Sequence, residues 1–146
     1  MQDQLQTSLN LRSCTYASEW LNAMLESNAV LSAILAVIHP SLYDAGWKTM
    51  NRLRNTPWIE DHDVIMQWAS TFSSASVISN RITPLHRDQN LRYNWYDMLV
   101  TSGNYGNCNL KLLGIEVSLK YGPGTVVDIS GYALQQEVPY FERDRV

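Results

Sequence analysis

The fold class depends most on residues 115–129, which read Ile-Glu-Val-Ser-Leu-Lys-Tyr-Gly-Pro-Gly-Thr-Val-Val-Asp-Ile. From Ile115 to Tyr121, apolar side chains alternate strictly with polar ones. Because successive side chains of a strand point to opposite faces, this pattern predicts a strand with one buried face and one solvated face. The Gly-Pro-Gly sequence at 122–124 then predicts a turn into a second strand over 125–129.

Other short β-prone runs surround this pair of strands. Further strands are predicted at 76–80, 98–101 and 133–138, with a loop at 103–107 and a turn at 130–131. Many short strands separated by turns indicate an antiparallel sandwich or jelly roll. We therefore expect a β-core over residues 75–146.

The preceding half of the chain has helical periodicity. Apolar residues at three- and four-residue spacing predict one helix from about residue 18 to 39, with Ser18 as its N-cap. A second helix is predicted over 42–53, and its inward-facing residues are expected to be Trp47, Met50 and Leu53. The polar residues 1–15 are expected to form a flexible N-terminus. The fold class predicted from these patterns is α+β, a single domain over 16–146 in which a helical part (16–72) packs on the β-core.

The composition excludes several classes of protein. Of the 146 residues, 45% are hydrophobic, so the chain is not disordered. Only 17% are charged, against about 25% in an average soluble protein. We therefore expect either a partner or further chain to cover part of the surface. The net charge of −3 excludes a general electrostatic surface for nucleic acid, so any such contact requires a local basic patch.

Cysteine usage and hydropathy indicate the compartment. Cys14 and Cys108 are far apart and lack a C-x-x-C motif, which favours buried free thiols in a reducing compartment over a disulfide or a zinc site. The N-terminus is too polar for a signal peptide. The longest apolar run, 29–38, is half of the roughly 20 residues that a membrane span needs. We expect a soluble intracellular protein.

The motif with the clearest chemistry is Pro84-Leu-His86-Arg-Asp88, after a predicted strand. Side chains two residues apart on a strand point to the same side, so His86 and Asp88 can bind one metal ion together. They would supply one His and the carboxylate of the 2-His-1-carboxylate site of Fe(II) oxygenases. Such a site needs a second His in a facing strand and, further on, a basic residue to bind a carboxylate. Residues 131–145 occupy that place, and Arg145 meets the second requirement.

Several motifs in order resemble one family. The chain is similar to the fungal branch of the TET/J-binding-protein oxygenases, which are Fe(II)- and 2-oxoglutarate-dependent dioxygenases with a double-stranded β-helix core, commonly associated with transposable elements. The resemblance covers most of residues 16–146. It is carried by Ser76-Val-Ile-Ser-Asn-Arg81, Thr83-Pro-Leu-His-Arg-Asp88, Trp95-Tyr-Asp-Met-Leu-Val-Thr-Ser-Gly103, Tyr121-Gly-Pro-Gly-Thr-Val-Val127 and Asp144-Arg-Val146.

The resemblance implies a set of site residues. His86 and Asp88 would be iron ligands, and Arg145 would bind the distal carboxylate of 2-oxoglutarate. The family's second metal-binding His falls at Gln136, whose neutral amide oxygen is a weaker donor for Fe(II) than an imidazole. Arg143 stands where the family usually has Gly. His39 and His62 lie too far upstream to replace the missing ligand and are read as caps or surface residues.

The resemblance also implies the substrate, which is a 5-methylpyrimidine base in nucleic acid, extruded into the pocket. DNA would then be the partner and the nucleus the location. Arg81, Arg87 and Arg92 are the candidates for phosphate contacts. Three further residues near the expected site are interpreted as turn or packing residues, namely Asn90, Asp97 and Tyr105.

Two alternatives to a working oxidase stay open. One is a truncated paralogue with little or no activity, because Gln136 replaces a ligand and the chain stops at Val146, inside the strand that would carry Arg145. That ending predicts a frayed last strand, an unpaired neighbouring edge and a β-core that is incomplete at its C-terminus. The other alternative is a module that binds nucleic acid or protein without chemistry.

Overall fold

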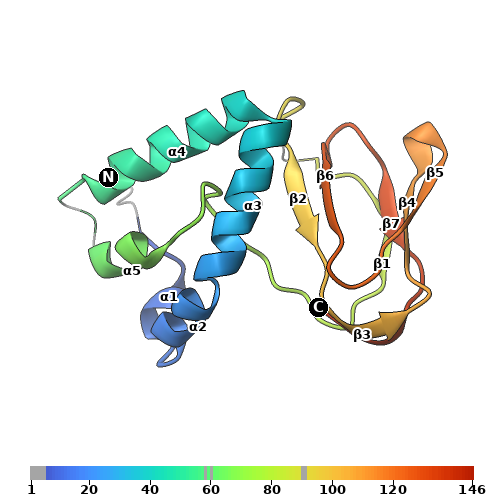
Figure 1. Cartoon of the computed structure of the whole chain (residues 1–146), viewed down its shortest axis with the longest axis horizontal. Helices are drawn as coiled ribbons and strands as arrows, with labels where there is room; N and C mark the ends of the chain where they lie inside the picture. Colours follow the sequence, from blue (N-terminus) through green and yellow to red (C-terminus); the bar gives the residue numbers. More distant parts are fainter. Residues whose placement is uncertain (1–5, 58, 60, 90–91) are drawn as a thin grey trace. The chain divides into compact units, whose positions relative to one another are not determined.

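The computed structural model describes residues 6–57, 59, 61–89 and 92–146, with the side chains of 142–144 outside that description. The chain divides into two compact units, one ending at Ala75 and the other beginning at Ser76. Helices occupy the first unit and strands the second (Figure 1). The chain is thus a mixture of helices and antiparallel strands.

The first unit holds five helices among its described residues. They are α1 (Leu9–Ser13), α2 (Ala17–Ala23), α3 (Leu25–Ile38), α4 (Pro40–Arg54) and α5 (His62–Gln67). Leu21, Met50 and Trp68 form the buried cluster of this unit, and Leu11 of α1 packs against it. The side chains of Thr7 and Arg12 both contact the Asp61 carboxylate, which joins the polar N-terminal segment to the start of α5.

The single helix predicted over 18–39 is wrong, because α2 and α3 meet at Met24 with a bend of 50°. Met24 has ψ −4°, far from the α-helical value of about −42°, and one such residue redirects the helix without changing its apolar spacing. Ser18 does not cap α2; its hydroxyl donates to Gln67 instead. No single described helix is long and apolar enough to cross a membrane, whereas the bent pair α2–α3 passes that test by length and composition alone.

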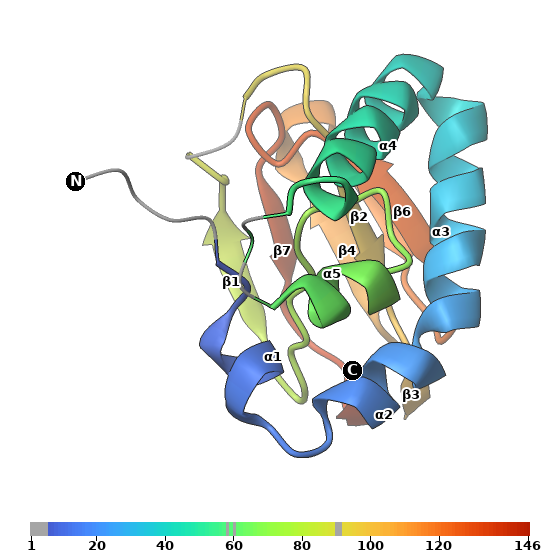
Figure 2. The same cartoon turned by 90° about the vertical axis from the view of Figure 1, so that its left-hand side faces the viewer.

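His39 forms the corner between α3 and α4 (Figures 1 and 2). Its Nδ1 accepts a hydrogen bond from the Leu42 N–H at 3.2 Å, which caps α4. Pro40 takes the first helical position, where its fixed φ suits the helix and its missing N–H is not needed. The helix therefore begins two residues before the predicted start.

The inward face of α4 is only partly as predicted. Met50 is buried and Leu53 packs on the same cluster, whereas Trp47 is 43% exposed. Trp47 stacks on Tyr43, one turn earlier, with ring centroids 6.5 Å apart, and the central carbon of the Arg54 guanidinium lies 5.7 Å from the Trp47 ring centroid. The prediction for Trp47 was wrong because rings at i and i+4 can cover each other on the helix surface.

Gly46 marks a close approach between α4 and the segment after α5. A Cβ built on Gly46 would lie 2.5 Å from the Thr71 carbonyl oxygen. Gly46→Ala is therefore expected to lower the free energy of unfolding by about 1–3 kcal/mol, although Ala is the better helix former by about 1 kcal/mol. Chemical denaturation measures the change, with Thr49→Ala on the exposed face of α4 as the control. An unchanged or higher stability for Gly46→Ala would show that this contact opens freely.

The second unit consists of short strands. They are β1 (Thr83–His86), β2 (Asp97–Val100), β3 (Gly103–Gly106), β4 (Asn109–Leu112), β5 (Val117–Lys120), β6 (Val126–Ile129), β7 (Gln136–Val138) and β8 (Glu142–Arg145). A four-stranded sheet has the order β1-β7-β4-β5, and β2–β6 and β3–β8 form two separate pairs. Every one of these pairings is antiparallel. Among the described residues the sheets are not closed into a jelly roll.

One predicted strand is absent and another is shorter than predicted. Residues 76–80 form no strand; Asn80 has φ +51° and exchanges hydrogen bonds with Arg145 instead. In the alternating run, residues 113–115 form a 3-10 helix and Glu116 is left-handed, so the strand begins only at Val117. Ile115 is 54% exposed. Alternation alone did not show that a turn separates this end of the run from the sheet.

The predictions of a loop at 103–107 and of a frayed last strand were also wrong. Residues 103–106 form β3, which pairs with β8 along its whole length from Gly103↔Arg145 to Gly106↔Glu142. Beyond the strands, Ser102 and Val146 exchange two backbone hydrogen bonds of 2.7 and 2.9 Å. The strand that carries Arg145 is thus paired up to the last residue.

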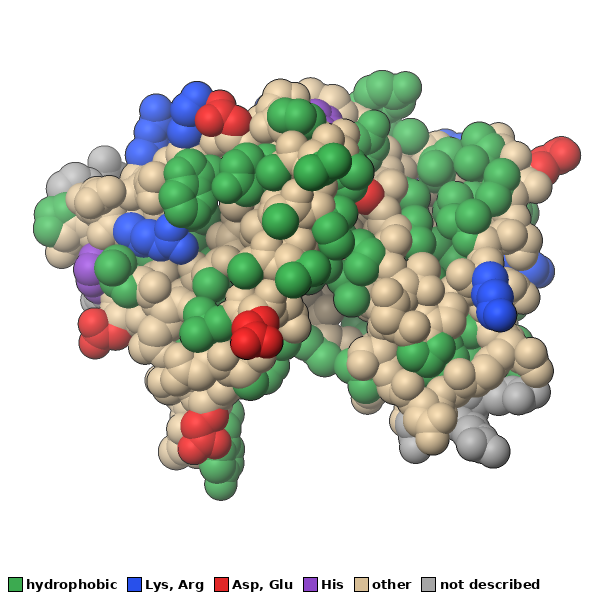
Figure 3. Space-filling view, viewed as in Figure 1, with side chains coloured by type: hydrophobic (Ala, Val, Ile, Leu, Met, Phe, Trp, Pro, Cys, Tyr) green, Lys and Arg blue, Asp and Glu red, His purple; other side chains and the backbone are tan. Residues whose placement is uncertain are grey.

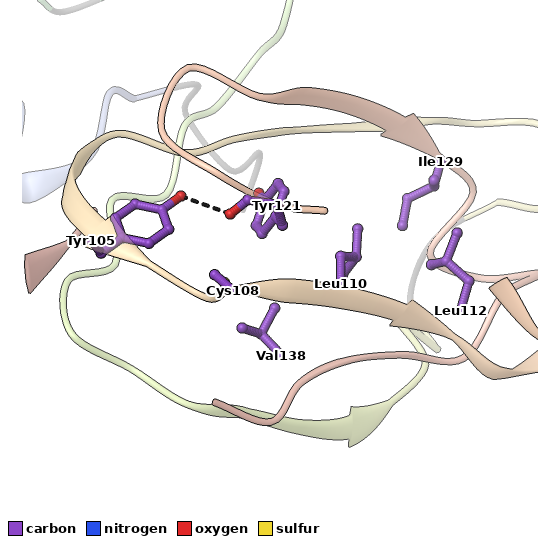
Figure 4. Packing of buried hydrophobic residues seen from close by; sticks show 7 residues of the cluster. All are labelled: Tyr105, Cys108, Leu110, Leu112, Tyr121, Ile129 and Val138. Atoms are coloured by element: carbon purple, nitrogen blue, oxygen red, sulfur yellow. Dashed lines mark hydrogen bonds between the residues drawn. The ribbon is translucent and has the colours of Figure 1, made fainter. Parts of the chain in front are cut away.

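The core of the second unit lies between these sheets and is shown in Figure 4. Cys108, Leu110 and Leu112 alternate along β4 and its start and point to one buried face. The Tyr105 hydroxyl contacts Thr101 and donates to the Tyr121 carbonyl at 3.0 Å. Both cysteines are free, but only Cys108 is buried; Cys14 is exposed, against the prediction.

Charged side chains are sparse on the molecular surface. On the face drawn in Figure 3, hydrophobic side chains are more widespread than charged ones. Large apolar residues on both units are exposed, Val37 and Tyr93 among them. The low charge fraction in the sequence therefore corresponds to an apolar surface rather than to a larger buried core.

Candidate metal and dicarboxylate site

The pairing of β1 with β7 assembles the candidate site (Figure 2). In this antiparallel ladder His86 lies opposite Gln136, with a register shift between Thr83 and His86. Asp88 follows β1 by two residues, and its N–H donates to the Gly131 carbonyl at 3.0 Å. The three residues that the resemblance assigns to metal binding come together from segments nearly fifty positions apart.

Specific contacts join these three side chains. The Gln136 amide donates from Nε2 to Asp88 Oδ2 at 2.9 Å. His86 Nε2 lies 3.7 Å from Asp88 Oδ1. His86 Nδ1 lies 2.8 Å from the Pro84 carbonyl oxygen, which can only accept, so Nδ1 carries the proton. In the neutral ring Nε2 then holds the lone pair and faces Asp88.

Gln136 is held in a buried position. It is 5% exposed, and its Oε1 accepts no hydrogen bond from any residue that the structure describes. A buried oxygen without a donor costs free energy that a bound cation or water would recover. The amide nitrogen of Gln136 thus has a hydrogen-bond partner in Asp88, whereas its oxygen has none among the described residues.

Asp97, at the start of β2, is a residue of this site that sequence reasoning set aside. Its Oδ2 is buried and accepts no hydrogen bond within the described part of the chain. Burial raises the pKa of Asp97, and the neighbouring carboxylates of Asp88 and Asp128 raise it further. A Cβ on Gly131 would overlap Asp88 Oδ2 and come within 3.0 Å of Asp97 Oδ2, so Gly131 leaves the space that both carboxylates use.

Asp97→Asn is expected to stabilise the protein at neutral pH. The folded state disfavours the charged form of Asp97, so wild-type stability increases as the pH falls through its raised pKa towards the ordinary value of 3.8. The amide removes the repulsion from Asp88 and offers it a donor. The advantage of the variant should therefore shrink on acidification, which thermal unfolding between pH 4 and 8 measures. A less stable variant at pH 7 would contradict this account.

Arg145 lies at the other end of the same buried face. Leu112 pairs with Gln136, and Cys108, four residues earlier, receives a contact of 3.9 Å from Arg145 Nη1. At about 3.3 Å per residue, Cys108, just before β4, and Leu112, at its end, are roughly 13 Å apart. Arg145 is 8% exposed, and its Nη2 donates to the Arg81 carbonyl at 3.1 Å.

Aromatic rings cover the Arg145 guanidinium. Its central carbon lies 5.0 Å from the Phe141 ring centroid and 5.8 Å from that of Tyr121. Burial raises the pKa of Tyr121 to about 12, with Arg145 acting in the opposite direction, so the phenol stays neutral. No carboxylate of the described residues forms an ion pair with Arg145. A buried guanidinium of this kind fits an anionic ligand.

Within the part of the chain that the structure describes, the side chains of the remaining candidate residues contribute no contact to the His86, Asp88 and Gln136 group. Arg81, Arg87 and Arg92 are exposed, while Asn90 and the Arg143 side chain fall outside the described residues. Tyr105 is a buried packing residue. In the helical unit, His39 caps α4, and His62 Nε2 lies 2.8 Å from the Arg54 carbonyl oxygen.

The fold and the site together define the class of protein. Short antiparallel strands present a His-x-Asp motif opposite a third ligand position, and a buried arginine lies further along the same face. The chain matches the family model of the Tet_JBP oxygenase domain of the 2OGFeDO superfamily over residues 2–135 and belongs to that family. The match includes His86 and Asp88 and ends one residue before Gln136. A search of curated proteins found no match.

Family membership implies a dioxygenase-like function and the use of Fe(II) and 2-oxoglutarate in general. The donor set of this chain does not fit a strong Fe(II) site. Within the described residues, no three His, Cys, Asp or Glu side chains converge where they could hold a metal. Gln136 stands in the third position and donates a hydrogen bond to the carboxylate that would bind the metal.

Proposed function

We propose that this chain is a 2-oxoglutarate-binding oxygenase domain with low affinity for Fe(II) and little turnover. Its ancestry would lie in the fungal, transposon-associated oxidases of 5-methylpyrimidine bases, and its β-core would be a double-stranded β-helix. The motifs listed for residues 76–146 support the ancestry. A nuclear location follows if the substrate is chromosomal DNA.

The observation that carries the proposal is the hydrogen bond from Gln136 Nε2 to Asp88 Oδ2. An imidazole at this position would present a lone pair to the metal. The amide instead presents an N–H to the carboxylate, and that hydrogen bond must break before Asp88 Oδ2 can bind a cation. Gln136 then offers a neutral oxygen, which Fe(II) binds less strongly than nitrogen.

We expect 2-oxoglutarate to bind because the surroundings of Arg145 suit a carboxylate ligand. Its guanidinium is buried and lies near the rings of Phe141 and Tyr121, and two of its nitrogens have only weak or neutral partners. A dicarboxylate bound there would place one of its carboxylates on Arg145. This chain would then bind and orient the dicarboxylate, although the chemistry that iron supplies is impaired.

Anaerobic titration with Fe(II), followed by succinate measurement with 2-oxoglutarate and a 5-methylcytosine oligonucleotide, tests the proposal. We expect weak iron binding and succinate release close to the enzyme-free background. Stoichiometric, tight iron binding with rapid succinate release would contradict the proposal and indicate a working base oxidase. Absence of any response to 2-oxoglutarate would instead favour a module without a cosubstrate.

A further inference from the structure

The second unit carries exposed aromatic side chains beside an arginine. We call this group the aromatic surface and define it as Arg92, Tyr93, Trp95 and Tyr132. Tyr93 is 73% exposed, Trp95 48% and Tyr132 43%. Groups of exposed aromatic side chains often mark interaction sites, because a partner that covers them removes their apolar surface from water.

Two turns hold the aromatic surface together. The Trp95 N–H donates to the Arg92 carbonyl at 3.0 Å, which closes one turn and places the Arg92 guanidinium 5.4 Å from the Trp95 ring centroid. Tyr93 meets Tyr132 edge to face, with centroids 6.4 Å apart and planes at 84°. Rings and guanidinium therefore have defined positions although they are exposed.

The aromatic surface is continuous with the candidate site. The Ser130 hydroxyl donates to the Tyr93 carbonyl at 3.0 Å and joins the two turns. The turn that begins at Ser130 contains Gly131, which leaves space for the Asp88 and Asp97 carboxylates, and the next residue is Tyr132. One turn thus contributes to both the aromatic surface and the candidate site.

The local charge is opposite to that of the whole chain. Residues 81–97 contain three arginines, Arg81, Arg87 and Arg92, and two acidic residues, Asp88 and Asp97, whereas the whole chain has a net charge of −3. All three arginines are exposed. Exposed rings interleaved with arginines are the combination that binds single strands, in which bases stack on rings and cations contact phosphates.

We propose that the aromatic surface binds single-stranded nucleic acid, with bases stacked on Trp95, Tyr93 and Tyr132 and with Arg92 against the phosphates. A single strand exposes the faces of its bases, whereas a duplex hides them, so the rings favour the single strand. The proposal rests on the proposed function only for the class of ligand. It requires neither iron nor 2-oxoglutarate.

Fluorescence anisotropy tests the proposal on the full chain, with chelator present and without 2-oxoglutarate. The probe is a labelled single-stranded DNA oligonucleotide, and the same sequence as a duplex is the comparison. We expect the single strand to bind more tightly, and Trp95→Ala to weaken its binding about tenfold, as expected for the loss of one stacked base. Trp95→Phe should retain most of the affinity because it keeps a ring.

The chain offers a matched control in Trp47. Its exposure, 43%, is close to that of Trp95, and Arg54 lies over its ring at 5.7 Å. Trp47→Ala should leave oligonucleotide binding unchanged. An equal loss in both variants, or equal binding of duplex and single strand, would overturn the proposal. The absence of oligonucleotide binding would also overturn the proposal. If the protein then self-associates and Trp95→Ala abolishes the self-association, the aromatic surface is a protein interface. Because metal is excluded, a failure here is distinguishable from a failure of the proposed function.

Discussion

Gln136→His is expected to raise the affinity of the protein for Fe(II) by at least about 100-fold, since changes one shell further from a metal already alter affinity 10- to 100-fold. The substitution completes two imidazoles and one carboxylate around one point. It also removes the amide N–H that donates to Asp88 Oδ2 and the Oε1 atom that has no donor among the described residues.

Isothermal titration under anaerobic conditions measures this gain, and succinate release shows whether the restored ligand set supports turnover. Gln136→Met is the control, because it removes the amide and adds no strong ligand. It should bind Fe(II) no better than the wild type. If Gln136→His leaves the affinity unchanged, position 136 is not a ligand position and the assignment from the resemblance is wrong.

Arg145→Met is expected to remove most of the stabilisation of the protein by 2-oxoglutarate. Removing one partner of a buried charge-assisted contact costs about 2–5 kcal/mol of binding, which lowers affinity by roughly 30-fold to several thousandfold. Wild-type protein at a ligand concentration of 100 Kd should gain about 2.7 kcal/mol. The variant should gain less than about 1 kcal/mol at the same concentration.

The stability without ligand separates a binding role from a structural one. Losing the hydrogen bond to the Arg81 carbonyl costs about 1 kcal/mol, and removing a buried charge offsets a comparable amount, so Arg145→Met should unfold close to the wild-type temperature. Arg81→Met keeps that carbonyl and should keep the full response to 2-oxoglutarate. A large loss of stability in Arg145→Met, with no ligand response in the wild type, would make Arg145 a structural residue.

Features that depend on local sequence could be predicted. The His-x-Asp motif, the turn at 122–124 and the α4 helix each follow from residues close together in the chain, and the structure contains them all. Two of the predictions that failed depended on one backbone angle or on a remote partner. Met24 bends a helix whose apolar spacing is unbroken, and residues 103–106 became β3 because β8 pairs with them.

The candidate site shows the same division. His86 and Arg145 could be proposed as site residues from the sequence because their chemistry and order along the chain are distinctive. Asp97 could not, because a lone Asp before an apolar strand is ordinary; its burial and its raised pKa arise only when Asp88 and Asp128 come near. Gly131 was interpreted as a turn residue, and its second role became visible only through the carboxylates beside it.

The sequence by itself determined the class of elements, the motif that carries the family and the absence of a His at position 136, since residue type and local spacing decide all three. Only the tertiary structure decided what Gln136 does. Its donor meets Asp88 because the β1–β7 register places the two segments together, and its acceptor is isolated by burial. Register and burial depend on contacts between distant residues, and so they also determined that Arg145 lies in a paired strand with its charge enclosed by aromatic rings.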